Sequence, residues 1–439
     1  MIVVRALVAA LGIAGLSLLL VAAAPSYDPW AWLLWGREVA RGTLSTTEGP
    51  AFKPLPVAAT TLLSVLGAAA PVAWVLLARA GAVLAVLLGL RLGRRLGGDL
   101  AGVLAAAGVA LCGGFLGYAA AGAETGWTIA FALAGAEAWR ADRHRLAIAC
   151  GVGCALLRVE AWPFLLVAGL VLWRRRPADR WLLAACAVAV PVLWFVPELL
   201  GSGDLLRSSE RARIPNPGQP ATAAVPALAA LREAAALPLW PLWAGAVACL
   251  LLPAGRAARP VLAAGLAWVA LVAVMAQAGY SGEARYALPG AALIAIAGAV
   301  GLVALARRAA AAAPARRAAV AVAALLVLVS AAPRLADLAD VRRRQAYQDG
   351  LASDLRAVIA AGGGREALLA CGRPYVGGLR GPLLAYHLDV EKRRVAFDPR
   401  PPGTLFRSRL GPLAAVEPPA APEFVPRARH GRWRLDAAC

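Results

Sequence analysis

Four short segments of this 439-residue chain hold the charged and aromatic residues that could do chemistry. They are 26–56 with Tyr27, Asp28 and Lys53, 122–125 with Glu124, 157–162 with Arg158 and Glu160, and 279–289 with Glu283, Arg285 and Tyr286. A positioned carboxylate can take a proton from a reacting hydroxyl group, and lysine or arginine side chains can bind a phosphate. Whether these residues act together depends on the elements that position them.

Each segment also has a purely structural interpretation. Asp28, which a proline follows, suits the start of a helix, and the tryptophans after it suit a membrane interface. Glu124 could complement the dipole of a helix that begins there. Arg285 could extend from a polar turn toward water, while Arg158 and Glu160 could form a buried ion pair.

The composition identifies the class of protein that holds these residues. Apolar residues make up 61% of the chain and charged residues 16%, with a mean hydropathy of +0.67, against about 45–50% and about 25% in soluble domains. This excludes an ordinary soluble enzyme, a disordered chain and an outer-membrane barrel, whose strands would alternate. The net charge of +20 comes from arginine clusters between apolar runs, so we expect no nucleic-acid partner.

Apolar runs of roughly 17–25 residues predict membrane-spanning helices. They lie at about 6–24, 72–90, 99–118, 123–139, 181–200, 237–254, 260–278, 286–306 and 318–332. The first run resembles a secretory signal, but Pro25 follows the small residues and disfavours cleavage, so we expect a retained signal-anchor.

The arginine clusters set the orientation, because cytoplasmic loops carry an excess of Lys and Arg. They lie at 91–95, 140–145, 174–180, 256–259 and 307–317. A cytoplasmic N-terminus at Arg5 places the first two clusters inside. The two long loops, 25–71 and 201–236, and everything after 332 then fall on the extracytoplasmic side.

The stretch 146–173 has arginine clusters on both sides, so both of its ends should be cytoplasmic. Each half is about 18–20 Å long as a helix, too short to cross a core of about 30 Å. We expect a broken helical hairpin with Arg158 and Glu160 at its tip, facing a polar cavity, since charges at membrane depth must pair or face water. The alternative is one long span, which would move the three later clusters outside.

Residues 333–439 differ in character and predict a small soluble α/β domain. A charge-rich helix is expected over 334–361, ended by three glycines, with short strands at 367–371, 394–397 and 433–437. Cys371 and Cys439 could form a disulfide in an oxidising compartment. The other cysteines lie in apolar runs and are expected to be small buried residues: Cys112, Cys150, Cys154, Cys186 and Cys249.

The predicted fold is therefore an all-α polytopic membrane protein of about 11 helical membrane segments, hairpin included, over residues 1–332. The α/β domain of 333–439 follows it. Only Lys53 and Lys392 are lysines among the basic residues. This preference for arginine, with abundant Ala, Gly and Val, is typical of a high-GC bacterial genome, so we expect a bacterial plasma membrane.

Together the four segments resemble the GT-C superfamily of integral-membrane glycosyltransferases. These enzymes use polyprenyl-phosphate-linked sugars and include the protein mannosyltransferases and the aminoarabinose and arabinosyl transferases. The matching elements are the acidic first outer loop ending in Lys53-Pro54-Leu55-Pro56, Glu124-Thr125, the run 157–162, and Arg285-Tyr286-x-x-Pro289. The resemblance covers roughly residues 1–332 and leaves the C-terminal domain unexplained.

The resemblance implies a role for each candidate residue. Asp28 would be the catalytic base, and Lys53, Arg158 and Arg285 would bind the donor phosphate. Glu124 would act in catalysis by positioning the acceptor or supporting a divalent metal. The substrate cavity would be lined by Tyr27, Glu160, Glu283 and Tyr286. Direct attack would invert the anomeric centre, since no second carboxylate nucleophile is evident.

The chain departs from the family pattern at two places. Many members carry a pair of acidic residues in the first outer loop, whereas here Asp28 stands alone at the expected position. This departure puts metal dependence in doubt, and no cofactor is certain. Val159 replaces the proline usual between the arginine and the glutamate, which weakens the match of the hairpin.

The resulting hypothesis is an inverting hexosyl- or pentosyltransferase on the extracytoplasmic face. It would move a sugar from a polyprenyl-phosphate donor to a glycan, lipid or protein acceptor of the cell envelope, among membrane lipids. Two alternatives stay open. A transporter or flippase of lipid-linked glycans would also place charges at membrane depth, and a non-catalytic envelope-assembly scaffold would rely on the C-terminal domain.

Overall fold

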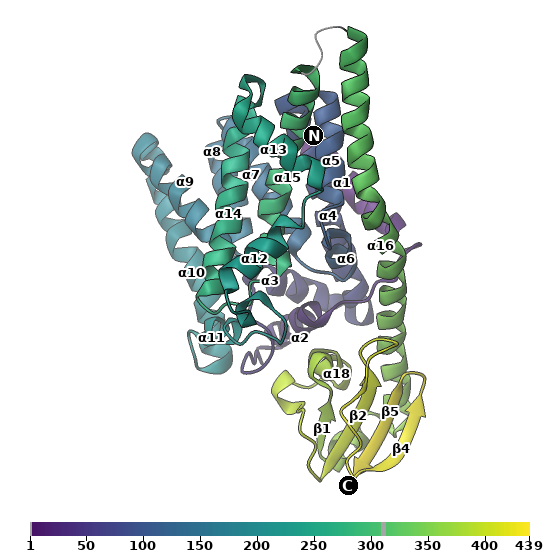
Figure 1. The fold of residues 1–439 in the computed structure, drawn as a ribbon. Coiled ribbons are helices and arrows are strands. Elements are labelled where there is room, and N and C mark those ends of the chain that lie inside the picture. The colour runs from purple at the N-terminus through teal and green to yellow at the C-terminus, as the bar shows by residue number, and fades with distance from the viewer. Residues whose placement is uncertain (1, 309–312) are drawn as a thin grey trace.

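The computed structural model describes residues 2–308 and 313–439, as a helical bundle with a small sheet domain at one end (Figure 1). The chain begins with α1 (Ile2–Ser17), α2 (Tyr27–Arg41), α3 (Pro54–Leu63), α4 (Ala70–Gly97), α5 (Asp99–Ala110), α6 (Phe115–Ala120), α7 (Thr125–Arg140), α8 (His144–Ala155) and α9 (Trp162–Arg175). It continues with α10 (Arg180–Ser202), α11 (Arg207–Ala212), α12 (Pro226–Ala235), α13 (Trp240–Leu251), α14 (Arg259–Gln277), α15 (Ala284–Arg308) and α16 (Ala313–Ala361).

The apolar runs of the sequence fall on helices. Five helices among the described residues are long and apolar enough to cross a membrane, or six if the bent pair α12 and α13 counts as one span. This is fewer than the roughly 11 segments expected. One reason is that the apolar parts of α1, α5 and α8 are too short to cross a membrane as single helices. The run 99–118 is divided into α5 and α6, and Gly114 at the break has a φ of 76° that favours glycine.

The run 318–332 does not end where the expected polar helix begins. Both belong to α16, a helix of 49 residues that continues without a break through Pro333. No glycine separates the apolar part from the charged part, so the helix has no reason to stop before Ala361. Figure 1 shows α16 running from the far end of the bundle to the sheet domain.

The stretch 146–173 folds as two short helices joined by a break. α8 and α9 pack against each other, and the chain turns between them at a short 3₁₀ turn, Val159–Ala161. Arg158 precedes this turn in an extended conformation, with φ −145° and ψ 127°. The break therefore holds Arg158 and Glu160 at the tip of the pair.

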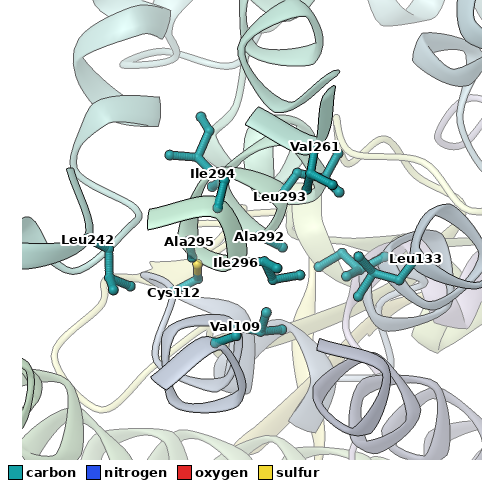
Figure 2. Packing of buried hydrophobic residues seen from close by; sticks show 14 of the residues in the cluster. Val109, Cys112, Leu133, Leu242, Val261, Ala292, Leu293, Ile294, Ala295 and Ile296 are labelled. Atoms are coloured by element: carbon teal, nitrogen blue, oxygen red, sulfur yellow. The ribbon is translucent and has the colours of Figure 1, made fainter. Parts of the chain in front are cut away.

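The core is centred on α15, which is buried along most of its length between α13, α14, α4 and α5. Figure 2 shows its residues Ile294 and Ile296 among apolar side chains of the neighbouring helices. Glycines let α13 and α15 approach closely: a Cβ on Gly245 would lie 1.9 Å from the Gly298 carbonyl oxygen. Small residues at such a contact are typical of helices that pack in a membrane.

The C-terminal domain contains α17 (Gly364–Cys371), β1 (Arg373–Val376), α18 (Gly381–Leu388), β2 (Gly403–Arg409), β3 (Val416–Glu417), β4 (Val425–His430) and β5 (Trp433–Ala438). The strand order is β1-β2-β5-β4, with β3 on β2. β1 pairs parallel with β2, and the other pairs are antiparallel.

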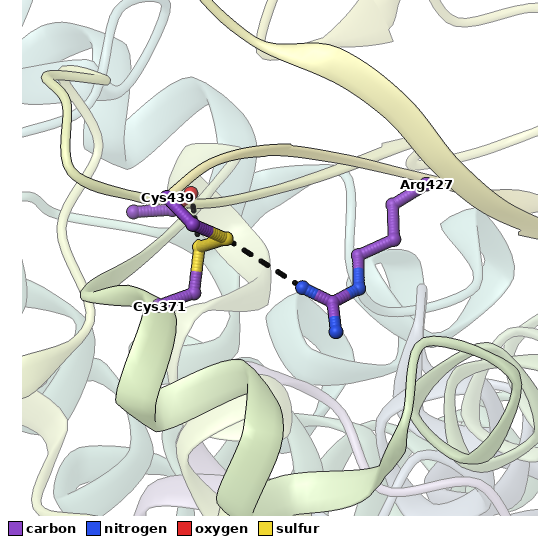
Figure 3. The surroundings of a disulfide bond; sticks show 4 residues. Cys371, Arg427 and Cys439 are labelled. Carbon is purple, nitrogen blue, oxygen red and sulfur yellow. Dashed lines mark hydrogen bonds between the residues drawn. A yellow bond between two sulfur atoms is a disulfide. The ribbon is translucent and has the colours of Figure 1, made fainter.

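Two of the three predicted strands are wrong. The segment 367–371 lies in α17, where Leu368 and Cys371 are both buried, a spacing of three that suits a helix. The segment 394–397 is a turn that makes only one isolated bridge, from Ala396 to Tyr375. The third strand coincides with β5. Cys371 and Cys439 form a disulfide that ties the end of the chain to α17, with Arg427 beside the sulfur of Cys439 (Figure 3).

The C-terminal domain is fastened to α2. The ring of Tyr386 on α18 lies 5.1 Å from that of Trp30. Arg37 and Arg41 of α2 both pair with Asp389, at 3.1 and 2.7 Å. The helix that carries Asp28 is therefore held by the domain that follows the bundle.

Candidate active site

A cavity of about 690 Å³ opens where the bundle meets the C-terminal domain. Its wall is formed by the start of α2, the loop before α3, the residues around α11, the start of α15 and two loops of the C-terminal domain. The charged and tyrosine side chains on it are Tyr27, Asp28, Glu48, Lys53, Arg207, Glu210, Arg211, Glu283, Arg285, Tyr286 and Lys392. These segments come from distant parts of the sequence, and the fold brings them together.

One group of charges lies on the cavity wall and consists of Asp28, Glu283 and Arg285. Nη1 of Arg285 donates to Oδ2 of Asp28 at 2.8 Å, and Nε of Arg285 lies 2.5 Å from Oε2 of Glu283. The side chains of Asp28 and Arg285 are 14% and 19% exposed. We call these three residues the wall group; its single cation has two carboxylate partners that face the same open space.

A second group lies behind the wall and consists of Lys53, Glu124, Arg158 and Glu160. Oε1 of Glu124 pairs with Nζ of Lys53 and lies 2.8 Å from Nη2 of Arg158. Arg158 is also 3.9 Å from Glu160. Glu124 is completely buried, and Lys53 alone among the four reaches the cavity. We call these residues the buried group.

Tyr286 connects the two groups. The guanidinium carbon of Arg158 lies 4.2 Å from the centre of its ring, and that of Arg285 lies 5.2 Å away. Each cation is therefore attracted to the electron-rich ring. The tyrosine sets the spacing between the cation inside the protein and the cation on the wall.

The backbone places these side chains at helix starts. Lys53 is extended because Pro54 follows it and disfavours the helical conformation. Glu124 immediately precedes α7, after a turn in which Gly122 has a φ of 81° and its carbonyl accepts from Trp74. Asp28 lies in the first turn of α2, where a carboxylate is favoured by the helix dipole.

Tyr27 completes the cavity wall beside Asp28. Burial, and next the negative charge of Asp28, raise the pKa of the Tyr27 hydroxyl to about 12. The side chain is therefore protonated at neutral pH and can donate a hydrogen bond to an acceptor in the cavity.

The sequence-predicted residues divide into those on the wall and those behind it. Tyr27, Asp28, Lys53, Glu283, Arg285 and Tyr286 line the cavity, whereas Glu124, Arg158 and Glu160 lie behind it. Their chemical roles stay predictions. Among the residues that the structure describes, no three His, Cys, Asp or Glu side chains gather as a metal site would require.

Sequence reasoning missed Glu198, which anchors the loop that carries Lys53. Glu198 is buried in α10, accepts from the backbone N–H of Phe52 at 3.3 Å, and pairs with Arg207 at 3.4 Å. Its position as a carboxylate within an apolar run is a signal that could have found it, because such a charge must have a partner.

Lys392 was also missed, although the sequence contained a sign of it. The lysine pairs with Glu48 at 2.7 Å and lies 4.6 Å from the ring centre of Phe397. Both lysines of this arginine-rich chain, Lys53 and Lys392, therefore lie on the cavity wall. Where arginine is the default, a lysine marks a place that needs a compact ammonium group.

No family model matches the chain, and no curated protein does. Two crystal structures of ArnT from Cupriavidus metallidurans are similar to it. The one bound to undecaprenyl phosphate has a TM-score of 0.57 at 15% identity, and the one in the apo state 0.54 at 16%. Both comparisons cover 100% of this chain and 98% of the other.

This likeness includes the C-terminal domain, which the resemblance noted in the sequence did not reach. At such low identity it concerns the fold. The GT-C resemblance inferred from the four segments is confirmed at that level, and the chain has an ArnT-like fold over its whole length.

Proposed function

We propose that this protein is an inverting GT-C glycosyltransferase that uses a polyprenyl-phosphate-linked sugar. One observation carries the proposal. On the cavity wall, the carboxylate of Asp28 lies within hydrogen-bond distance of Arg285, and Lys53 lines the same cavity. The ArnT-like fold supports it, since one of the similar structures is bound to undecaprenyl phosphate.

The proposed reaction needs two functions on the wall. Asp28 takes the proton from the acceptor hydroxyl as its oxygen forms a bond to the anomeric carbon. The bond from that carbon to the phosphate oxygen breaks, and its electron pair leaves with the polyprenyl phosphate. Arg285 and Lys53 stabilise the charge that develops on this leaving group. Attack from the side opposite the phosphate inverts the anomeric centre.

In this proposal the buried group keeps Lys53 in place. Glu124 holds Lys53 and Arg158 together, and Arg158 supports Tyr286 behind the wall. Glu124 is a positioning residue here, because its complete burial leaves it no contact with the cavity. The same burial argues against its binding an acceptor or a metal.

The acceptor would enter the cavity beside the C-terminal domain. Loops of the C-terminal domain contribute Leu379, Lys392 and Phe397 to the lining of the cavity. The side chains of Leu379 and Phe397 are exposed, so they can contact a bound molecule. An acceptor on the extracytoplasmic face of a bacterial membrane fits this arrangement, whether glycan, lipid or protein.

Binding of polyprenyl-phosphate sugars to the purified protein in nanodiscs tests this proposal. Wild type should bind at least one donor of a panel, and Arg285→Ala should bind it at least tenfold more weakly. Arg211→Ala is the matched control, because it removes a half-buried arginine from the same cavity and leaves the contact between Arg285 and Asp28 unchanged. Absence of binding across the panel, or equal losses in both variants, would contradict the proposal.

A further inference from the structure

Every cation of the two groups has a carboxylate partner. Glu124 serves Lys53 and Arg158, while Asp28 and Glu283 serve Arg285. An anionic ligand must therefore compete with a carboxylate for its cation. Glu124 cannot be displaced into the cavity without leaving a buried charge unpaired, which is strongly unfavourable. The exchange is therefore easiest at Arg285.

The contacts of Arg285 decide which of its carboxylates yields. Glu283 is itself held by the side-chain amide of Gln219, to which it hydrogen-bonds. Asp28 has Arg285 as its only ion-pair partner among the residues that the structure describes. The remaining nitrogen, Nη2, has only a long contact of 3.5 Å to the hydroxyl of Tyr286. A phosphate that takes Nη1 and Nη2 as a fork displaces Asp28 and leaves the Glu283 contact intact.

This exchange has a chemical consequence for Asp28. In the ion pair, Oδ2 of Asp28 accepts a hydrogen bond from Nη1 of Arg285 at 2.8 Å, so a guanidinium N–H occupies this oxygen. When the phosphate takes Nη1, Oδ2 is released and can accept a hydrogen bond from an acceptor hydroxyl, the contact through which a general base takes a proton. The same event that seats the donor phosphate therefore prepares the carboxylate that must deprotonate the acceptor.

We propose that Arg285 exchanges Asp28 for the donor phosphate, so that Asp28 becomes available as a base only when the donor is bound. This inference rests on the proposed function and adds an order to it, with donor first and acceptor second. Arg285 binds the phosphate and, while no phosphate is bound, keeps Asp28 in an ion pair. Glu283 is the positioning residue that holds Arg285 on the wall during the exchange.

The test is the affinity for polyprenyl phosphate, measured in phosphatidylcholine nanodiscs, which carry no net charge to compete. If Asp28 competes for Arg285, removing its charge should tighten binding: we expect Asp28→Asn to bind about five- to tenfold more tightly than wild type. Glu210→Gln is the matched control. It removes one negative charge from the same cavity, from an exposed residue whose side chain has no ion pair in the described structure, and we expect a change below about twofold.

Asp28→Ala serves as a second variant, and thermal unfolding of each protein establishes that it is folded. Tighter binding by both Asp28 variants than by Glu210→Gln supports the exchange. A different result would overturn the exchange and leave the proposed function standing. In that result wild type binds, Arg285→Ala does not, and the folded Asp28 variants bind no more tightly than wild type. If neither wild type nor any variant binds polyprenyl phosphate or its sugars, the proposed function itself fails.

Discussion

The wall group and the buried group use the same chemical types and differ in what surrounds them. Around Glu124 one completely buried carboxylate joins two cations. Around Arg285 one cation joins two carboxylates on a cavity wall. The first arrangement cannot lose a member without leaving an unpaired buried charge. In the second arrangement, water or a ligand can replace one of the two carboxylates on Arg285. The buried group is therefore structural, and the wall group is the one that can react.

The largest expected effect is on activity at the wall group. Asp28→Asn keeps the shape of the side chain and removes its capacity to take a proton. We expect transfer to fall by about 10²–10⁴-fold, with little change in melting temperature, since the lost ion pair is partly exposed. Parallel measurements of kcat and of thermal unfolding check this; full activity in the variant would remove Asp28 from the role of base.

The buried group should give the opposite result, with stability as the main loss. Glu124→Gln leaves Lys53 buried with no ion-pair partner among the described residues, and Arg158 with Glu160 at 3.9 Å. We expect a loss of about 3–5 kcal/mol in the free energy of unfolding. Chemical unfolding in detergent, compared with Asp28→Asn, measures it. Equal stability of the two variants would break the comparison.

A double variant sharpens the interpretation of the buried group. Combining Glu124→Gln with Arg158→Met removes both sides of the 2.8 Å contact between these residues, whereas each single variant leaves one side without the other. We expect the double variant to be more stable than the sum of the two single losses predicts, by about 1–3 kcal/mol. A double-mutant cycle of unfolding free energies gives this value. Strict additivity would show that the contact between Glu124 and Arg158 contributes nothing.

The smallest effect concerns Glu38, a carboxylate on the same helix as Asp28 that is buried without an ion-pair partner among the described residues. It accepts from the backbone N–H of Ser45 at 3.0 Å. Burial raises its pKa from 4.5 to about 7. The neutral form is therefore favoured in the fold, and its contribution to stability is present below pH 4.5 and lost as the pH rises through about 7.

Glu38→Gln removes this pH dependence. At pH 8.5 we expect the variant to melt about 2–4 °C above wild type, and the difference should shrink toward pH 5.5, where both side chains are neutral. Glu366→Gln, in the C-terminal domain, is a control outside α2. A constant difference at all pH values would show that Glu38 is ionised throughout.

The sequence predicted those features that local composition determines. A helix in a membrane needs a long apolar run, so the runs marked the helices, and the arginine clusters marked the hairpin of α8 and α9. The glycines at 362–364 marked the end of α16. The strands could not be predicted as well: β4 is exposed at five of its six residues and shows no alternation, and α17 is too short for its period to be distinguished from a strand.

The residues named from the sequence lie on the cavity wall or directly behind it, but the sequence did not show which of them lie where, and it did not point to Glu198 or Lys392. Nothing in the sequence around Glu124 or Asp28 says which carboxylate reaches a cavity, because burial is decided by helices distant in the chain. The same holds for Lys392, whose partner Glu48 precedes it by most of the chain. Whether a charged residue lies on the cavity wall or in the protein interior is decided by the tertiary structure.

The central claim is that this protein breaks the bond between a sugar and polyprenyl phosphate. The most direct measurement is mass spectrometry of the polyprenyl phosphate that the protein releases. Wild type and Asp28→Asn, each in sealed vesicles, are incubated with a panel of polyprenyl-phosphate sugars and a bacterial envelope extract. We predict release by wild type from at least one donor, with a sugar-bearing product of inverted configuration, and almost none by the variant. Movement of intact donor across the vesicle membrane, without release by either protein, would contradict the account and indicate a transporter.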